Sequence, residues 1–237
     1  NPDYLKRWSE RFALFPAPKT TGGIAVHAAS VGEVNAASAM IRGLLIRYPD
    51  HPLCITTLTP TGSDRVQALF SDEVFHVYAP LDLPGAVRRF FERTRPRLLI
   101  VMETEIWPNF FFEATRHGVP VVIANARISE SSIGAYRRLV QFIGPALKRV
   151  SRIGAQSQLD ADRLIELGAD PGRMSITGNL KFDVDLPPSL FEQAESISMA
   201  WGTDRLVLLA GSTHEADETA VFEAFSQLLN DFPKALL

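Results

Sequence analysis

The sequence predicts an α/β protein with a Rossmann-like, mainly parallel β-sheet. From residue 24 onward, short apolar runs rich in β-branched residues alternate with longer segments of helical periodicity, the pattern of βαβ units. Several helical segments end at Gly, with Pro close behind, as in "RHGVP" and "ELGADP". A parallel sheet places the functional loops at one edge, so these loops are the first places to look for a site.

Seven strands and six helices are expected in the first part of the chain. The strands are expected at 24–29, 53–58, 74–77, 98–102, 121–124, 152–155 and 175–177. The helices are expected to begin near Val34, Ser63, Pro84, Pro108, Tyr136 and Leu159.

Two domains are predicted. Residues 1–182 hold the alternating pattern, and 183–189, "DVDLPPS", break it with prolines and acids, as a linker does. Residues 190–237 then predict a helix at 190–201, a strand in "RLVLLAGS" and a helix at about 215–230. One strand and its helices cannot bury their own faces, so we expect 190–237 to be the incomplete start of a second Rossmann-like domain.

The N-terminal segment "NPDYLKRWSERFALFP" predicts a basic amphipathic helix. Its apolar residues recur at helical spacing between lysine and arginine. Such a helix either packs on its own domain or lies on anionic lipid headgroups, and the sequence leaves both open. No window approaches the ~20 apolar residues of a membrane span, and no signal-peptide pattern is present.

Composition argues against several functions. The formal net charge of −3 disfavours a nucleic-acid partner, which needs a concentrated basic surface. Cys54 is the only cysteine, so no intramolecular disulfide is possible. The motif "HEADE" at 214–218 lacks the second histidine that a zinc site needs one turn later, and we expect no metal.

Polar residues gather in the loops that follow the expected strands. In open α/β sheets, ligands bind at these carboxyl ends, where helix N-termini also point. The candidates are Ser30, Gly32, Glu33, Thr61, Gly62, Glu103, Glu105, Asn109, Arg127 and Lys181, with Ser212 and Thr213 after the strand of the second domain.

Glu33, in "HAASVGEVNAA", has two interpretations. An acid in the first turn of a helix is stabilised by the macrodipole by ~0.3–1 kcal/mol, without any ligand. Alternatively, Gly32 lets a ligand approach the backbone, and apolar walls raise the pKa of the carboxyl toward that of a useful base.

Glu103 and Glu105 follow an otherwise apolar strand in "METEIWPN". One acid is expected to face the cleft and the other to cap the helix that Pro108 opens. Arg127 of "NARIS" is a candidate ion-pair partner, and a purely structural ion pair there stays open beside a ligand-facing acid. For the hydroxyl-rich "TPTGS" and "GSTHE" loops, anion binding competes with simple helix capping. Lys181 in "GNLKFD" is either a solvated surface charge or a ligand for phosphate or carboxylate.

Taken together, the motifs resemble those of the Kdo (3-deoxy-D-manno-oct-2-ulosonic acid) transferases. They are "HAASVGEVNAA", "TTLTPTGSDRVQ", "VYAPLDLP", "METEIWPN", "IANARIS", "AQSQLDADRLIELGA", "TGNLKFD" and "STHEADE", in this order and spacing. The resemblance runs from "YLKRWSERF" to the last residue.

The resemblance implies a GT-B-type, metal-independent glycosyltransferase. It implies transfer of Kdo from CMP-Kdo to the lipid A precursor, with inversion, at the cytoplasmic face of the inner membrane. In that family an N-terminal anchor usually precedes the basic segment, and we expect it to be absent from this chain. Glu33 matches the catalytic base, and Glu103 and Lys181 match positions that stabilise the transition state. Most residues that hold cytidine are expected beyond Leu237.

Two other functions remain open at this point. A nucleotide-sugar epimerase shares the same architecture, as does a non-catalytic sugar-binding module in which Glu33 only accepts hydrogen bonds. A binding module tolerates the loss of an ionisable group at Glu33, whereas a general base does not.

Overall fold

The computed structural model describes residues 2–183, 188–202 and 204–237. The chain divides into two compact units, Asn1–Val184 and Asp185–Leu237. Among the described residues, no helix combines the length and the apolar character that a membrane crossing requires.

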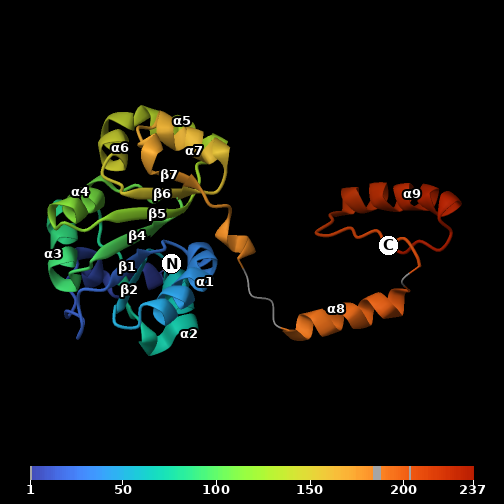
Figure 1. Cartoon of the computed structure of the whole chain (residues 1–237), viewed down its shortest axis with the longest axis horizontal. Coiled ribbons are helices and arrows are strands. Elements are labelled where there is room, and N and C mark those ends of the chain that lie inside the picture. Colours follow the sequence, from blue (N-terminus) through green and yellow to red (C-terminus); the bar gives the residue numbers. More distant parts are fainter. Residues whose placement is uncertain (1, 184–187, 203) are drawn as a thin grey trace. The chain divides into compact units, whose positions relative to one another are not determined.

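The first unit is built on a parallel seven-stranded sheet, which confirms the α/β prediction (Figure 1). Its strands are β1 (Ile24–His27), β2 (Leu53–Thr57), β3 (Phe75–Tyr78), β4 (Leu98–Met102), β5 (Val121–Ala126), β6 (Arg152–Ala155) and β7 (Met174–Ile176). They lie in the order β3-β2-β1-β4-β5-β6-β7, and every neighbouring pair is parallel. The order reverses between β1 and β4, so their carboxyl ends mark the switch point where ligands bind in such sheets.

Helices cover both faces of this sheet. They are α1 (Val31–Arg47), α2 (Pro60–Phe70), α3 (Pro84–Thr94), α4 (Pro108–Arg116), α5 (Glu130–Arg138), α6 (Val140–Leu147) and α7 (Gln158–Glu166). One buried apolar cluster joins the sheet to α1 and α2, and a second, larger one joins it to α3–α7. Successive strand residues point to opposite faces, so Val26 enters the first cluster and Ala25 the second.

Three helices begin earlier than the sequence predicts. Thr59 caps α2 and Pro60 takes its first position, so this helix begins three residues before Ser63. Ser30 caps α1 in the same way. The helix expected near Tyr136 is two helices, α5 and α6, which are separated at Leu139.

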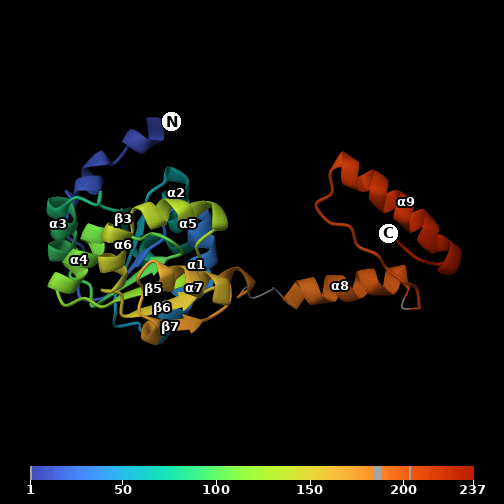
Figure 2. The ribbon, with the colours of Figure 1, turned by 90° about the horizontal axis from the view of Figure 1, so that it is seen from above.

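The N-terminal segment is not the predicted continuous helix. It forms two 3-10 helices, Pro2–Leu5 and Trp8–Phe12, and Arg7 between them has a left-handed backbone (φ 53°) that interrupts the helical path. Figure 2 shows the segment, in dark blue, at the rim of the first unit. Leu5 is 71% exposed, whereas Phe15 is buried in the core.

This segment covers the outer edge of β3, the edge strand of the sheet. The Glu10 carboxylate accepts a hydrogen bond from the Tyr78 backbone N–H (2.8 Å), and Arg7 donates to the His76 carbonyl (3.3 Å). The Arg7 and Arg11 guanidinium groups lie over the Tyr78 ring, at 4.7 and 4.6 Å from its centroid. Arg7 and Arg11, two of the three basic residues of the segment, therefore contact their own domain. They cover a strand edge whose backbone groups would otherwise lack partners.

The second unit contains α8 (Pro188–Trp201) and α9 (Glu215–Asp231), close to the two helices predicted there. The strand predicted in "RLVLLAGS" is reduced to one isolated parallel bridge between Val207 and Leu236. Among the described residues of this unit no second strand completes a ladder, and large apolar side chains such as Leu209 and Phe191 are exposed. Of the predicted linker 183–189, residues 184–187 lie outside the described residues.

Candidate active site

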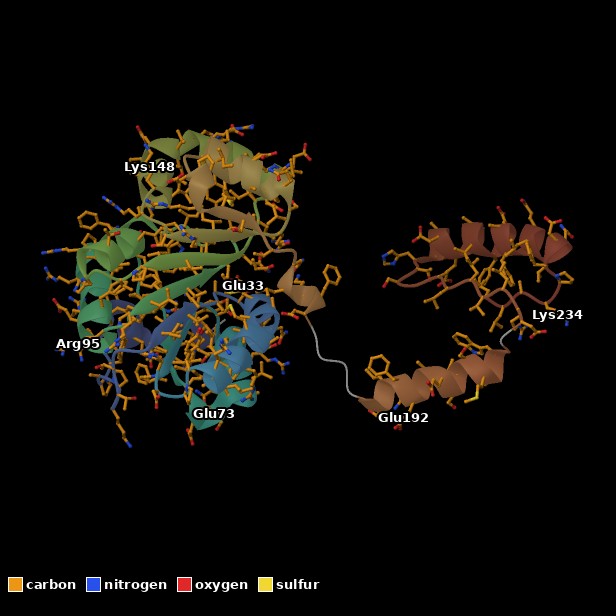
Figure 3. The ribbon with its side chains drawn as sticks, viewed as in Figure 1. Glu33, Glu73, Arg95, Lys148, Glu192 and Lys234 are labelled. Atoms are coloured by element: carbon orange, nitrogen blue, oxygen red, sulfur yellow. The ribbon has the colours of Figure 1, made fainter. Side chains whose placement is uncertain are left out.

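The candidate site lies at the carboxyl ends of the central strands, where the loops after β1, β2, β4 and β5 meet. β1 pairs with β2 on one side and β4 on the other, and β5 follows β4. Glu33 lies here at the start of α1 (Figure 3). The topology therefore brings together the residues that the sequence places after four separate strands.

The Glu33 side chain folds back over the N-terminus of its own helix. Its Oε2 accepts a hydrogen bond from the Ala29 backbone N–H (2.9 Å), and its Oε1 accepts one from the Ser30 hydroxyl (3.1 Å). Ser30 is the N-cap, and its Oγ accepts a long hydrogen bond from the Glu33 N–H (3.4 Å). The helix-start interpretation of Glu33 is correct, and these contacts also fix the direction of its carboxylate.

Glu33 is half-buried, and this raises the pKa of its carboxyl above the ordinary value. The hydrogen bonds from Ala29 and Ser30 and the nearby His27 act in the opposite direction, while the negative charge of Glu105 raises the pKa further. A carboxyl with a raised pKa is a stronger base once ionised, so Glu33 has the electrostatic character that the sequence suggests.

Glu105 is near enough to Glu33 for its charge to affect the Glu33 pKa, and it faces Trp107 and His27 of β1. Its Oε2 accepts a hydrogen bond from the Trp107 indole N–H (2.8 Å) and lies 3.9 Å from Nε2 of His27. Burial raises the pKa of this carboxyl, but the combined effect of His27 and Trp107 is larger and lowers it below its ordinary value. Two acids of one site therefore have pKa values shifted in opposite directions, a pattern typical of acid and base assignments.

Glu103 forms the predicted ion pair with Arg127. The Arg127 Nε lies 3.1 Å from Glu103 Oε2, and the carboxylate is mostly buried while the guanidinium is more than half exposed. Glu103 has a left-handed backbone (φ 53°), and its N–H donates to the Ala124 carbonyl of β5 (2.9 Å). Such a conformation is unusual for a non-glycine residue and is common at functional sites.

Gly62 and Gly32 differ in their surroundings. A Cβ on Gly62 would lie 2.9 Å from the Thr59 hydroxyl oxygen and 3.3 Å from the Ser30 carbonyl carbon, so Gly62 allows the starts of α1 and α2 to pack together. A Cβ on Gly32 would meet only Ser30 Oγ, at 3.8 Å, so the backbone there is open to a ligand. Thr61 is exposed at the start of α2, and its hydroxyl donates to Thr59 (3.4 Å).

Asn109 has a structural role that its sequence motif does not indicate. The Asp82 carboxylate accepts hydrogen bonds from the backbone N–H groups of Asn109 (3.1 Å) and Phe110 (2.8 Å), so it caps α4 from another loop. The Asn109 amide donates to the Asp82 carbonyl (2.7 Å). Asp82 lies in the motif "VYAPLDLP", and only the spatial neighbourhood of the two loops reveals its function as a cap.

Lys181 lies on a short 3-10 helix, Leu180–Phe182, and is exposed. The Leu180 side chain packs on the apolar cluster that contains α1. The Leu180 N–H donates to the buried Asn125 side chain (3.0 Å), which fixes this turn at the end of β5. The structure therefore brings the Lys181 turn to the side of the sheet that carries α1.

Ser212 and Thr213 belong to the second unit. Ser212 has a left-handed backbone (φ 59°) and is exposed, and the Thr213 hydroxyl donates to Glu218 in the first turn of α9 (3.1 Å). Their contribution to a common site stays a prediction.

No sequence pattern marks His27, Trp107 and Tyr136 as residues of the site. His27 is the first residue of "HAASVGE" and looked like part of an apolar strand; only the pairing of β1 with β4 shows that it faces Glu105. The Tyr136 hydroxyl donates to the Thr104 carbonyl (3.1 Å), and burial and the Glu105 charge raise the Tyr136 pKa. Within residues 2–183, 188–202 and 204–237, no three His, Cys, Asp or Glu side chains gather as a metal site would require.

Comparison with known proteins identifies the family. A family model described as "3-Deoxy-D-manno-octulosonic-acid transferase (kdotransferase)" matches residues 6–184. The chain is 39% identical to the 3-deoxy-D-manno-octulosonic acid transferase of Haemophilus influenzae over 100% of its length and 56% of that protein. It is 36% identical to the enzyme of the same name from Bordetella pertussis, over 94% of the chain and 51% of that protein. The chain thus spans about half the length of the curated relatives it matches.

Solved structures with much lower sequence identity share the fold. A UDP-GlcNAc 2-epimerase from Neisseria meningitidis superimposes with a TM-score of 0.54 at 13% identity, over 90% of this chain and 63% of that one. A glycosyltransferase from Rickettsia africae gives 0.53 at 12% identity, over 88% of this chain and 58% of that one. These structures support the predicted GT-B-type architecture. From the matched family model and the identity across its full length, the chain belongs to the 3-deoxy-D-manno-octulosonic acid (Kdo) transferase family.

Proposed function

We propose that this chain contributes the acceptor-binding part of a glycosyltransferase that moves Kdo from CMP-Kdo to the lipid A precursor. The observation that carries the proposal is Glu33: a half-buried carboxylate with a raised pKa at the end of β1, in a chain of the Kdo transferase family. Residues 1–182 would bind the acceptor. Within the second unit, Ser212 and Thr213 would bind a phosphate of the donor.

Glu33 is proposed as the general base. It removes the proton of the acceptor hydroxyl as that oxygen attacks the anomeric carbon of Kdo, and the bond from this carbon to the CMP phosphate oxygen breaks. The electron pair leaves with CMP, the proton stays on Glu33, and attack opposite to the leaving group inverts the configuration. Ala29 and Ser30 hold the carboxylate in place, and the open backbone at Gly32 leaves room for the sugar.

Glu103 and Lys181 are proposed to stabilise the transition state. Positive charge develops on the sugar and negative charge on the departing CMP, so a carboxylate and an ammonium group act where those charges appear. Arg127 holds Glu103 through their ion pair, which fixes its orientation. Each such group typically contributes ~10²–10⁴-fold to the rate.

We further propose that the enzyme acts at the cytoplasmic face of the inner membrane without a metal ion. The exposed apolar residues Leu5, Trp8 and Leu14 of the N-terminal segment offer the contact with lipid, since Arg7 and Arg11 bind the domain itself. Liposomes containing anionic lipid should retain the protein, and Leu5→Ser with Trp8→Ser should release it. Equal retention of both forms would remove this role.

Transfer in excess EDTA should match that in buffer, and a loss restored by Mg²⁺ would refute metal independence.

The transfer assay uses the full-length protein with CMP-Kdo and the lipid A precursor. Wild type should transfer Kdo, and Glu33→Gln should lose ~10²–10⁴-fold in rate at neutral pH. Transfer by the amide variant at the wild-type rate would refute the base assignment. The absence of transfer by wild type would refute the proposed reaction and reopen the two alternatives, a nucleotide-sugar epimerase or a sugar-binding module.

A further inference from the structure

His27 is a buried polar residue beside the site that the proposed mechanism does not use. It lies at the carboxyl end of β1, is fully buried, and its ring packs against Trp107 at a centroid distance of 4.9 Å and against Phe110 at 6.1 Å. Its Nδ1 lies 2.9 Å from the Thr56 hydroxyl on β2. A histidine enclosed in this way has a fixed ring plane.

The other ring nitrogen of His27 faces the Glu105 carboxylate. Nε2 is buried and has no hydrogen-bond partner among the described residues; it lies 3.9 Å from Glu105 Oε2, which is beyond hydrogen-bond length. If the Thr56 hydroxyl donates to Nδ1, Nε2 carries the hydrogen and points it toward this acceptor. Buried polar atoms without partners are rare in native structures, and catalytic hydrogen bonds often shorten only when substrate binds.

The Glu105 carboxylate is held from one side only. Trp107 donates to Oε2, and His27 faces the same oxygen. In the part of the chain that the structure describes, no side chain or backbone group donates to Oε1. The indole and the imidazole therefore set the direction of the carboxyl group and leave its second oxygen available in the site.

We propose that His27 is a positioning residue that keeps the Glu105 carboxylate ionised and fixed beside Glu33, so that the two acids act as a pair. Glu33 is then the base, and Glu105 supplies a constant negative charge next to it. The inference deepens the proposed function and depends on it for the role of Glu33 in transfer.

The effects of His27 and Glu105 on the two carboxyl pKa values differ in size. His27 lowers the pKa of Glu105, and the ionised Glu105 raises the pKa of Glu33. His27 also acts directly on Glu33, lowering its pKa, but less than Glu105 raises it. From the adjoining elements, Tyr136 of α5 has a raised pKa and stays neutral near pH 7.

The neighbouring ion pair of Glu103 and Arg127 is a further charged feature of these loops. Its two charges compensate each other, so the pair adds little net charge to the site. The carboxylate of Glu105 is therefore the negative charge whose removal changes Glu33 most.

The test is a titration of the carboxyl groups by NMR on the full-length protein labelled with 13C-glutamate, without substrate. His27→Phe should raise the pKa of Glu105, and Glu105→Gln, which can still accept the Trp107 hydrogen bond, should lower the pKa of Glu33. In transfer assays, Glu105→Gln should move the acid limb of the kcat/KM profile to lower pH. An unchanged Glu105 titration in His27→Phe would overturn the inference.

His76 provides the matched control. It is a second buried histidine bonded to a β2 threonine, with Nε2 3.1 Å from the Thr57 hydroxyl, but it lies on β3 beside Arg7. His76→Phe should leave both glutamate titrations unchanged. If His27→Phe does not fold, the smaller His27→Leu, which also lacks the ring N–H, should likewise raise the Glu105 pKa.

The titration separates this inference from the proposed function. Shifted pKa values in a protein that does not transfer Kdo would refute the function and leave the carboxylate pair intact. Transfer that depends on Glu33, together with unshifted titrations in the His27 and Glu105 variants, would refute the pair alone.

Discussion

At the scale of single residues, the structure shows how one carboxylate serves a helix and a site together. Glu33 accepts hydrogen bonds at the start of α1, which is an ordinary structural role, and its partial burial beside Glu105 gives it a raised pKa. The two interpretations that the sequence leaves open are therefore compatible. The capping contacts would orient the proposed base.

The raised pKa of Glu33 predicts a pH-dependent stability cost. The folded state retains the proton over a pH range in which the unfolded state has lost it, so stability falls as pH rises from the unfolded pKa through the folded one. Glu33→Gln removes this cost. In urea titrations, the free energy of unfolding of Glu33→Gln should therefore exceed that of wild type by more at pH 7 than at pH 4. An equal difference at both pH values would contradict the burial argument.

Gly62 tests how tightly the starts of α1 and α2 pack together. A Cβ there would press on Thr59 and on the Ser30 backbone, so Gly62→Ala should lower the free energy of unfolding by ~1–3 kcal/mol. Gly43 is the control, because it is exposed inside α1 with nothing within 4 Å of a Cβ. Gly43→Ala should stabilise by ~0.5–1 kcal/mol in the same urea titration. Stabilisation by both changes would show that the helix starts are not tightly packed.

At the scale of elements, the sequence predicts well where local signals agree. The strand at 98–102 and the helix beginning at Pro108 are confirmed to the residue, because apolar β-branched runs and a proline at the first helical position are local features. The ion pair of Glu103 with Arg127 is also confirmed, since neighbouring strands bring their loops together.

Other features depend on contacts between segments far apart in the sequence. The amphipathic pattern at the N-terminus is real, but Arg7, Glu10 and Arg11 bind the edge of β3 and its neighbours, and the continuous helix is lost. His27 and Asp82 gain their roles from partners on other strands and helices. Local periodicity does not contain that information.

The hydrogen bond from the Tyr78 N–H to Glu10, at the edge of β3, predicts that the N-terminal segment stabilises the fold. Glu10→Ala leaves the buried Tyr78 N–H without its acceptor, so the free energy of unfolding should fall by ~1–3 kcal/mol. Lys6→Ala is the control, because Lys6 pairs with Asp3 at the exposed surface, where water screens the pair and it contributes little to stability. Chemical denaturation measures both variants. A smaller loss of unfolding free energy for Glu10→Ala than for Lys6→Ala would refute the role of the Glu10–Tyr78 hydrogen bond.

At the scale of the whole molecule, the core belongs almost entirely to the first unit. Apart from Ala235, every buried apolar residue of the described chain lies before residue 170. Large apolar side chains of the second unit, among them Leu209 and Met199, are exposed. This distribution matches the sequence expectation that one strand and its helices cannot bury their own faces.

This distribution predicts that the first unit folds alone. A protein of residues 1–184 should unfold cooperatively, with the same urea midpoint as the 237-residue chain, because it retains both apolar clusters. Circular dichroism during urea titration measures this. A clearly lower midpoint for the shorter protein would mean that the second unit stabilises the first.

The central claim is that Glu33 is the base in Kdo transfer, and chemical rescue tests it most directly. In the full-length protein, Glu33→Ala should lose ~10²–10⁴-fold in initial rate with CMP-Kdo and the lipid A precursor. Added formate, a small carboxylate that fits the space left by the side chain, should restore part of that rate, with no effect on wild type. Transfer by Glu33→Ala at the wild-type rate without formate would contradict the assignment of Glu33 as the base.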